Sequence, residues 1–90
     1  MINEVEYIVI LASNNYASFL YKKLIERKCK VSYISVPRSI ARSCRKAIKF
    51  YKRDLNLVQQ EIKNNKLKSK GIYKIVIKNR KVNYVLVWLK

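Results

Sequence analysis

The hydrophobic and polar positions of the chain change period along its length, and each stretch predicts an element. Residues 5–12 are mostly β-branched, aromatic or aliphatic on both alternating faces, which is typical of a central strand covered on both sides. Residues 13–15, Ser-Asn-Asn, carry side-chain oxygens that favour a helix N-cap. A helix is predicted over about 16–28, because apolar residues recur there at three- and four-residue spacing. These residues are Ala17, Leu20, Tyr21, Leu24 and Ile25.

Polar and apolar residues alternate again at 30–36, which predicts a second strand. Pro37 should end this strand, because proline donates no ladder hydrogen bond. A second helix is predicted over 54–65, where Asp54 can act as the N-cap. Its inward face is formed by Leu55, Val58 and Ile62.

The last part of the chain predicts a β-hairpin. Strand patterns at 72–77 and 82–88 flank the polar sequence KNRK, so the turn is expected around Asn79. Alternation assigns one face of the last strand to Val82, Tyr84, Leu86 and Trp88. Because the first and last strands are apolar on both faces, we expect another subunit to cover the second face of the sheet in a homodimer.

Residues 39–53 fit two patterns, and the choice between them decides the fold. Helical spacing behind a Ser39 cap joins Ile40, Cys44, Ile48 and Tyr51. Strand alternation joins Lys46, Ile48 and Phe50. Periodicity slightly favours the helix, but a helix here would leave the strand at 30–36 with fewer partners, so topology favours a strand over 45–51.

With that strand, the elements follow the order strand, helix, strand, strand, helix, strand, with an additional C-terminal β-strand. This order is the α+β ferredoxin-like split βαβ arrangement (βαββαβ), a mainly antiparallel sheet with two helices on one face. Ninety residues suffice for one core, so we expect residues 1–90 to form a single domain.

The charge of the chain indicates an anionic partner without identifying it. Lys and Arg total 21 against 5 acidic residues, a formal net charge of +16. Such a surface attracts nucleic acid, acidic lipid, acidic protein or small oxyanions, but it also serves solubility alone.

Several classes of function find no support in the composition. The chain has two cysteines and no histidine, so one copy cannot complete a structural zinc site, and a cysteine or serine hydrolase would lack its base. Its single glycine cannot build a glycine-rich phosphate loop. No apolar run reaches the ~18 residues of a membrane span. We therefore expect no metal, no cofactor and no membrane association, and a cytoplasmic protein with reduced thiols.

The candidate for chemistry is Cys44, in the basic stretch VPRSIARSC at 36–44. Pro37 and Ser39 would shape this loop. Four cations near the thiol in sequence could stabilise its thiolate and attract an anionic donor: Arg38, Arg42, Arg45 and Lys46. Cys29 follows a predicted helix, where the dipole does not favour a thiolate, and is interpreted as structural.

Three segments carry a family resemblance: YIVILASNNYASFLYKKL at 7–24, SYISVPRSIARSC at 32–44 and KGIYKI at 70–75. Together they resemble the small putative selenium/sulfur carrier protein-like family, whose members pair a V-P-R-S/E-I-S-x-x-C-G type segment with a strand that ends in a G-I-Y turn. The resemblance covers about residues 5–76. It implies a βαββαβ domain with the cysteine after the second strand.

The chain also departs from that family. Arg45 stands where family members often have glycine, so the backbone freedom of glycine is missing after Cys44. The sequence KNRKVNYVLVWLK extends past the usual family end. The Cys-Pro-x-Pro motif of sulfurtransferase-A type proteins is absent.

Three hypotheses about function follow. In the first, the Cys44 thiolate carries sulfur or selenium between donor and acceptor proteins, as a carrier rather than an enzyme. In the second, the basic surface and seven tyrosines bind single-stranded RNA, although the Gly-aromatic signature of RNA-binding split βαβ domains is missing. In the third, Cys44 is a buried small hydrophobe in a structural or interaction protein.

Overall fold

The central strand β1 (Glu6–Leu11) has a partner on both sides, and the sheet is built outward from it. The computed structural model describes residues 5–37 and 46–88. The other strands are β2 (Ser32–Ser35), β3 (Lys46–Tyr51), β4 (Ser69–Lys78) and β5 (Lys81–Trp88). They form one sheet in the order β2-β3-β1-β4-β5, and every neighbouring pair is antiparallel.

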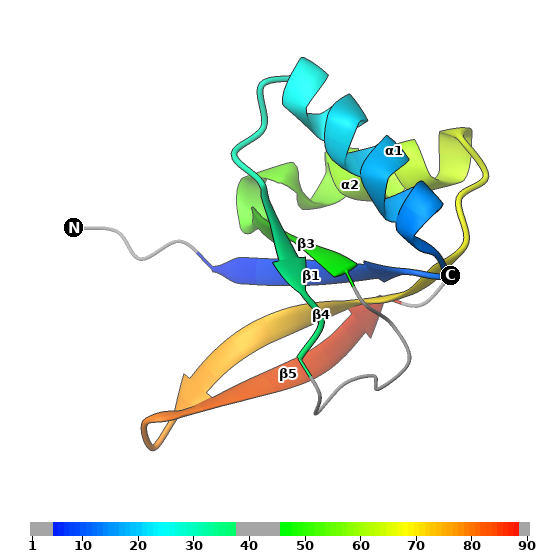
Figure 1. Ribbon diagram of the computed structural model, residues 1–90. Helices are drawn as coiled ribbons and strands as arrows, with labels where there is room; N and C mark the ends of the chain where they lie inside the picture. The colour runs from blue at the N-terminus through cyan, green and yellow to red at the C-terminus, as the bar shows by residue number, and fades with distance from the viewer. Residues whose placement is uncertain (1–4, 38–45, 89–90) are drawn as a thin grey trace.

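Two helices, α1 (Asn14–Glu26) and α2 (Leu55–Asn64), lie on one side of this sheet (Figure 1). A short 3-10 helix, η1 (Lys52–Asp54), joins β3 to α2. The arrangement confirms the α+β ferredoxin-like split βαβ fold with one additional C-terminal strand.

Strand β3 settles the ambiguous stretch in favour of the extended reading. Val9 lies opposite Ile48 on β3 and opposite Ile72 on β4, while β3 pairs with β2 along its other edge. A helix at this position would have left β1 and β2 without a common neighbour. The pairing of strands distant in sequence therefore outweighs the helical spacing seen locally.

The helix N-termini differ from each other. The backbone N–H of Tyr16 donates to Ser13 Oγ at 3.2 Å, which confirms the predicted cap, although α1 begins at Asn14 and not at Tyr16. Asp54 occupies the N-cap position of α2 but its side chain makes no capping hydrogen bond, so that prediction is wrong in its chemistry. The Asp54 carboxylate instead interacts with the thiol of Cys29.

The C-terminus of α1 closes in a Schellman motif. Lys28 N–H donates to Ile25 O at 2.9 Å and Cys29 N–H donates to Leu24 O at 3.0 Å. Lys28 has φ of 62°, a left-handed conformation in a position that usually holds glycine. Cys29 thereby takes the position whose side chain packs back on the helix.

The C-terminus of α2 repeats this motif. Lys66 N–H donates to Lys63 O at 3.3 Å and Leu67 N–H donates to Ile62 O at 3.0 Å, with Lys66 at φ of 53°. Leu67, like Cys29, packs on the core. Cys29 after α1 and Leu67 after α2 therefore occupy the same position of the Schellman motif, and at this position a hydrophobic side chain packs on the core.

The hydrophobic core lies between the helices and the sheet. Leu20, Leu24 and Val58 of the helices are fully buried, and the Tyr7 and Phe50 rings stack below them with centroids 5.8 Å apart. Each such side chain contributes about 1.5–3 kcal/mol by leaving water. The other strand residues of this cluster are Val9, Leu11, Ile48 and Ile72.

The predicted inward stripe of α1 is too wide by one residue. Ile25 is 47% exposed, because the helix presents Leu24 and not its neighbour to the sheet. On the other face of β1, Ile8 and Ile10 are also buried, which confirms the prediction of a strand covered on both sides.

The β4–β5 hairpin turns at Asn79 and Arg80, as predicted, and extends past the helical layer (Figure 1). A register shift near its base moves Trp88 opposite Ile72, while Leu86 lies opposite Tyr73. Trp88 therefore packs on the helix side of the sheet and does not share a face with Leu86, contrary to simple alternation.

Among the described ranges 5–37 and 46–88, no helix is long and apolar enough to cross a membrane.

Candidate functional site

Most of the predicted site lies outside the described residues. This holds for Cys44, for the cations Arg38, Arg42 and Arg45, and for Ser39. Their roles stay predictions. Pro37 and Lys46 are described: Pro37 is half-buried after β2, and Lys46 is exposed at the start of β3.

The two described ends of this segment lie at one edge of the sheet. Ser35, the last residue of β2, is the register partner of Lys46. The chain that carries Cys44 therefore leaves and re-enters the sheet at neighbouring positions. In the sequence, Cys44 and the cations predicted beside it fall between these two strands.

Lys46 contributes to an aromatic cluster that the sequence pattern did not indicate. Its ammonium lies 5.8 Å from the centroid of the Tyr33 ring, and Tyr33 stacks on Tyr21 of α1 with centroids 5.2 Å apart. A cation over an aromatic face is stabilised by the ring quadrupole. In the sequence, Tyr21 belongs to the apolar stripe of α1 and Tyr33 to one alternating face of β2. Neither pattern indicates that the two rings stack, because their contact depends on how α1 packs against β2.

Cys29 is buried, with 9% of its surface exposed, and belongs to the core cluster. Its position after the left-handed Lys28 directs it back toward Leu24, as the Schellman motif requires. This placement confirms that Cys29 has a structural environment.

The surroundings of Cys29 also keep its thiol protonated. Burial raises the pKa of Cys29 above its ordinary value, and the charge of Asp54 together with a hydrogen bond to that carboxylate raises the pKa further. Arg27 and Arg53 oppose this shift but do not reverse it. A thiol with a raised pKa is a poor nucleophile at neutral pH.

An ion pair between the helices holds Arg27 close to Glu61. Arg27 Nε lies 2.7 Å from Glu61 Oε2, and Asn65 Nδ2 donates to Glu61 Oε1 at 3.0 Å. The Glu61 side chain is 5% exposed, and these two contacts provide partners for both oxygens of its buried carboxylate. The pair fixes the end of α1 against α2 and thereby the position of Cys29.

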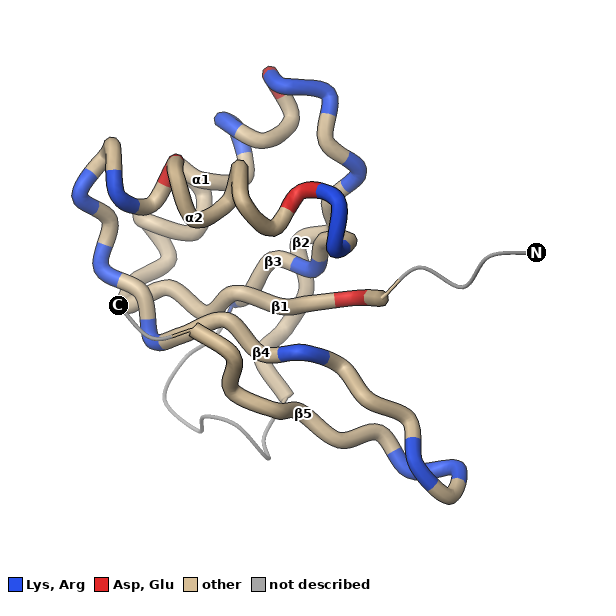
Figure 2. The backbone as a smooth tube through the Cα atoms, turned by 180° about the vertical axis from the view of Figure 1, so that it is seen from behind, with Lys and Arg blue, Asp and Glu red and all other residues tan. Residues whose placement is uncertain are grey.

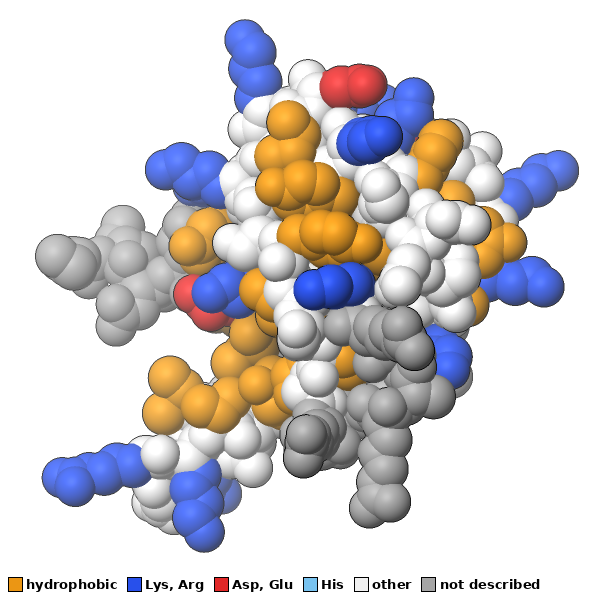
Figure 3. Space-filling model, viewed as in Figure 1, with side chains coloured by type: hydrophobic (Ala, Val, Ile, Leu, Met, Phe, Trp, Pro, Cys, Tyr) orange, Lys and Arg blue, Asp and Glu red, His pale blue; other side chains and the backbone are white. Residues whose placement is uncertain are grey.

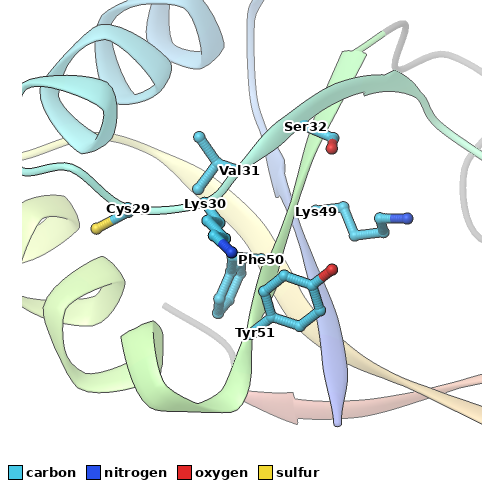
Figure 4. A pocket seen from close by; sticks show the side chains of 7 residues that line it. All are labelled: Cys29, Lys30, Val31, Ser32, Lys49, Phe50 and Tyr51. Carbon is cyan, nitrogen blue, oxygen red and sulfur yellow. The ribbon is translucent and has the colours of Figure 1, made fainter. Parts of the chain in front are cut away.

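A pocket of about 260 Å³ lies between the start of β2 and the end of β3. Its lining consists of Cys29, Lys30, Val31, Ser32, Lys49, Phe50 and Tyr51. Figure 4 shows the sulfur of Cys29 pointing away from Lys49 and from the Tyr51 hydroxyl. Lys49 also pairs with Glu6 at 3.8 Å. Within the pocket, Lys49 is therefore not placed to stabilise a thiolate at Cys29.

The part of the chain that the structure describes holds no group of three or more Cys, Asp, Glu or His side chains able to bind a metal ion.

A family model described as "Putative Se/S carrier protein-like" matches residues 6–74. The chain belongs to this family. The Se/S carrier protein-like region runs from β1 into β4, so it contains all of the βαββ core, α2, and the segment with Cys44. Strand β5 lies beyond it. No curated protein and no solved structure matches the chain.

Proposed function

We propose that the protein carries sulfur or selenium on Cys44 and passes it between a donor protein and an acceptor protein. The observation that carries the proposal is the family match over 6–74, a range that includes Cys44. Arg38, Arg42 and Arg45 are proposed to lower the pKa of the Cys44 thiol and to attract the anionic donor group.

The proposed step is an exchange at sulfur. The Cys44 thiolate attacks the terminal sulfur of a donor persulfide, the S–S bond of the donor breaks, and a new S–S bond to Cys44 forms. The donor leaves as a thiolate and takes up a proton, so no external oxidant or reductant is needed. Selenium bound to a donor thiol reacts in the same way. Between transfers Cys44 is a free thiol, which requires a compartment that keeps thiols reduced, such as the cytoplasm.

The environment of Cys29 supports the assignment of this role to Cys44. Cys29 is buried in the core and its pKa is raised, so of the two thiols it is the one unsuited to attack a donor. Lys46, two residues after Cys44 in the sequence, is exposed and adds a positive charge at the start of β3.

The competing RNA-binding hypothesis finds less support. RNA-binding split βαβ domains stack bases on aromatics of the central strands, on the sheet face opposite the helices. On that face β1 carries Ile8 and Ile10, and β3 carries Ala47 and Lys49. Tyr7 is buried under the helices instead.

The test is to load the protein with glutathione persulfide and to determine by mass spectrometry which cysteine gains one sulfur atom. We expect the gain on Cys44, its loss in Cys44→Ser, and an unchanged gain in the matched variant Cys29→Ser. Transfer onward is followed by labelled sulfur released to free glutathione. A gain on Cys29 alone, or none on either thiol, would contradict the proposal.

A second measurement addresses activation of the thiol. The rate of Cys44 alkylation by iodoacetamide against pH should give an apparent pKa below the ~8.5 of a free thiol. Replacing Arg38, Arg42 and Arg45 by glutamine should move it back toward that value. The same number of glutamines at Lys22, Lys52 and Lys68, exposed and remote in sequence, serves as the control.

A further inference from the structure

The β4–β5 hairpin exposes a cluster of large apolar side chains. Five of the eight such side chains exposed within residues 5–37 and 46–88 belong to it, and three of them, Ile77, Val82 and Leu86, form a patch on one face of the hairpin. The most exposed are Ile77 at 73% and its register partner Val82 at 51%. The others are Val85, Leu86 and Val87. Figure 3 shows hydrophobic side chains along the hairpin, outside the helix-covered body, with basic side chains at its tip.

The outer edge of the hairpin is also open for strand pairing. Strand β5 is the last in the sheet order, and no strand within the described residues pairs with its outer edge. Residues 82–88 contain no proline and no charged residue, the usual devices that block pairing at a sheet edge. An extended chain can therefore add its backbone hydrogen bonds to β5.

Charge decides what kind of chain fits there. Between 69 and 88 the hairpin has no acidic residue, and Figure 2 shows no Asp or Glu along β4 or β5. Its cations are Lys70, Lys74, Lys78, Arg80 and Lys81. A second copy would bring the same cations and a further formal charge of +16, which disfavours self-association. An acidic strand would instead neutralise the hairpin.

The turn retains a cation where the backbone favours glycine. Asn79 and Arg80 have φ of 53° and 64°, the two positive values that a two-residue type I′ turn requires. Glycine is preferred at the second of these positions, yet the chain has arginine there. Arg80 therefore holds a less favourable backbone conformation than glycine would at the tip of the hairpin.

We propose that the free edge of β5 binds an extended acidic segment of a partner protein, which joins the sheet as an additional antiparallel or parallel strand. Its apolar residues would cover side chains such as Val82 and Leu86, and its carboxylates would pair with Lys78, Arg80 and Lys81 at the tip. This docking does not involve the thiol. A Cys44→Ser protein should bind equally well, which separates failure of this proposal from failure of the carrier function.

The probe is a short dye-labelled peptide of alternating valine and glutamate, titrated with the full chain and followed by fluorescence anisotropy. The triple change Lys78→Glu, Arg80→Glu and Lys81→Glu should weaken binding about tenfold. The matched control Lys22→Glu, Lys52→Glu and Lys68→Glu alters net charge equally and should weaken it less than about twofold. A peptide with glutamine in place of glutamate should also bind weakly.

Hydrogen exchange on the unaltered protein provides the structural readout. Saturating peptide should slow exchange of β5 backbone amides and leave the amides of β2, the other edge strand, unchanged. Because no variant is needed, the result does not depend on how well the triple variant folds.

Four results would overturn the proposal. The first is equal loss of binding in the hairpin triple and in the control triple. The second is protection that does not include β5. The third is a dimer in sedimentation equilibrium that Ile77→Ser with Val82→Ser dissociates, which assigns the patch to a second copy. The fourth is tighter binding of single-stranded oligouridylate than of the peptide, lost in the hairpin triple.

Discussion

Strand β1 and the β4–β5 hairpin are made of the same kinds of residue but lie in different surroundings. All residues from Tyr7 to Leu11 are buried, whereas Ile77 and Val82 leave half or more of their surface in water. Both regions are β-branched and antiparallel. On the helix side the difference is the cover: Tyr7, Val9 and Leu11 pack under α1 and α2, whereas the hairpin extends past the helices (Figure 1). The residues of a strand therefore determine whether it forms, but they do not determine whether it is buried, because burial depends on the elements packed over it.

The sharpest test of this contrast compares a side chain of the helix layer that covers β1 with a side chain of the hairpin. Leu20→Ala removes a fully buried side chain of α1 and should lower the free energy of unfolding by about 2–5 kcal/mol. Ile77→Thr keeps the β-branched shape at an exposed position and should change it by less than about 0.5 kcal/mol. Urea unfolding measures both. Equal losses would mean that the hairpin is packed as tightly as the centre.

The sequence predicted what local pattern and chain order determine. The Ser13 cap and the hairpin turn at Asn79 are present, and the strand predicted over 45–51 is present from Lys46 to Tyr51, the part that the structure describes. Wrong or missed features depend on contacts distant in sequence. The Asp54 side chain makes no capping hydrogen bond to its own helix, and Trp88 changes face at a register shift. Of the candidate site, Lys46 and Pro37 alone lie within the described residues, so its arrangement stays a prediction.

The next largest effect concerns Gly71, where the two regions join. Its φ is 118°, and an added Cβ would lie 2.7 Å from Leu86 Cδ1 and 3.3 Å from Trp88 O. Gly71→Ala should therefore lower the free energy of unfolding by about 1–3 kcal/mol. In the double variant with Leu86→Ala, measured in the same urea series, part of the loss should be recovered because the side-chain clash is removed. Full recovery would show that backbone strain contributes nothing.

The hairpin tip should respond in the opposite direction. Arg80→Gly relieves the left-handed φ of 64° and should raise the free energy of unfolding by about 0.5 kcal/mol. Lys81→Gly, on the neighbouring strand position, should lower it instead. Thermal unfolding of the two variants and of the unaltered protein measures both changes in stability. A loss of stability in Arg80→Gly would indicate that the guanidinium makes a stabilising contact within the chain.

The smallest expected effect is a loss of stability at alkaline pH, caused by the buried thiol of Cys29. The raised pKa of Cys29 means that the unfolded thiol ionises before the folded one. Its contribution to stability is complete below the unfolded pKa, about 8.5 for a free thiol, and is lost as pH rises through the raised folded pKa. Above this pH the unaltered protein should lose stability faster than Cys29→Ala, in urea titrations at stepped pH. Parallel curves would contradict the raised pKa.

Because Cys29 is buried at the end of α1, its reactivity can report how often this part of the protein opens. Because Cys29 is only 9% exposed, we expect a maleimide to react with its sulfur chiefly when the end of α1 separates from α2 and the sheet. Under conditions where reclosing is faster than modification, the rate of labelling at Cys29 measures the equilibrium of that separation, with no introduced probe. The labelling rate of Cys29 in the presence of a bound peptide would show how far binding at the hairpin lowers the frequency of this opening.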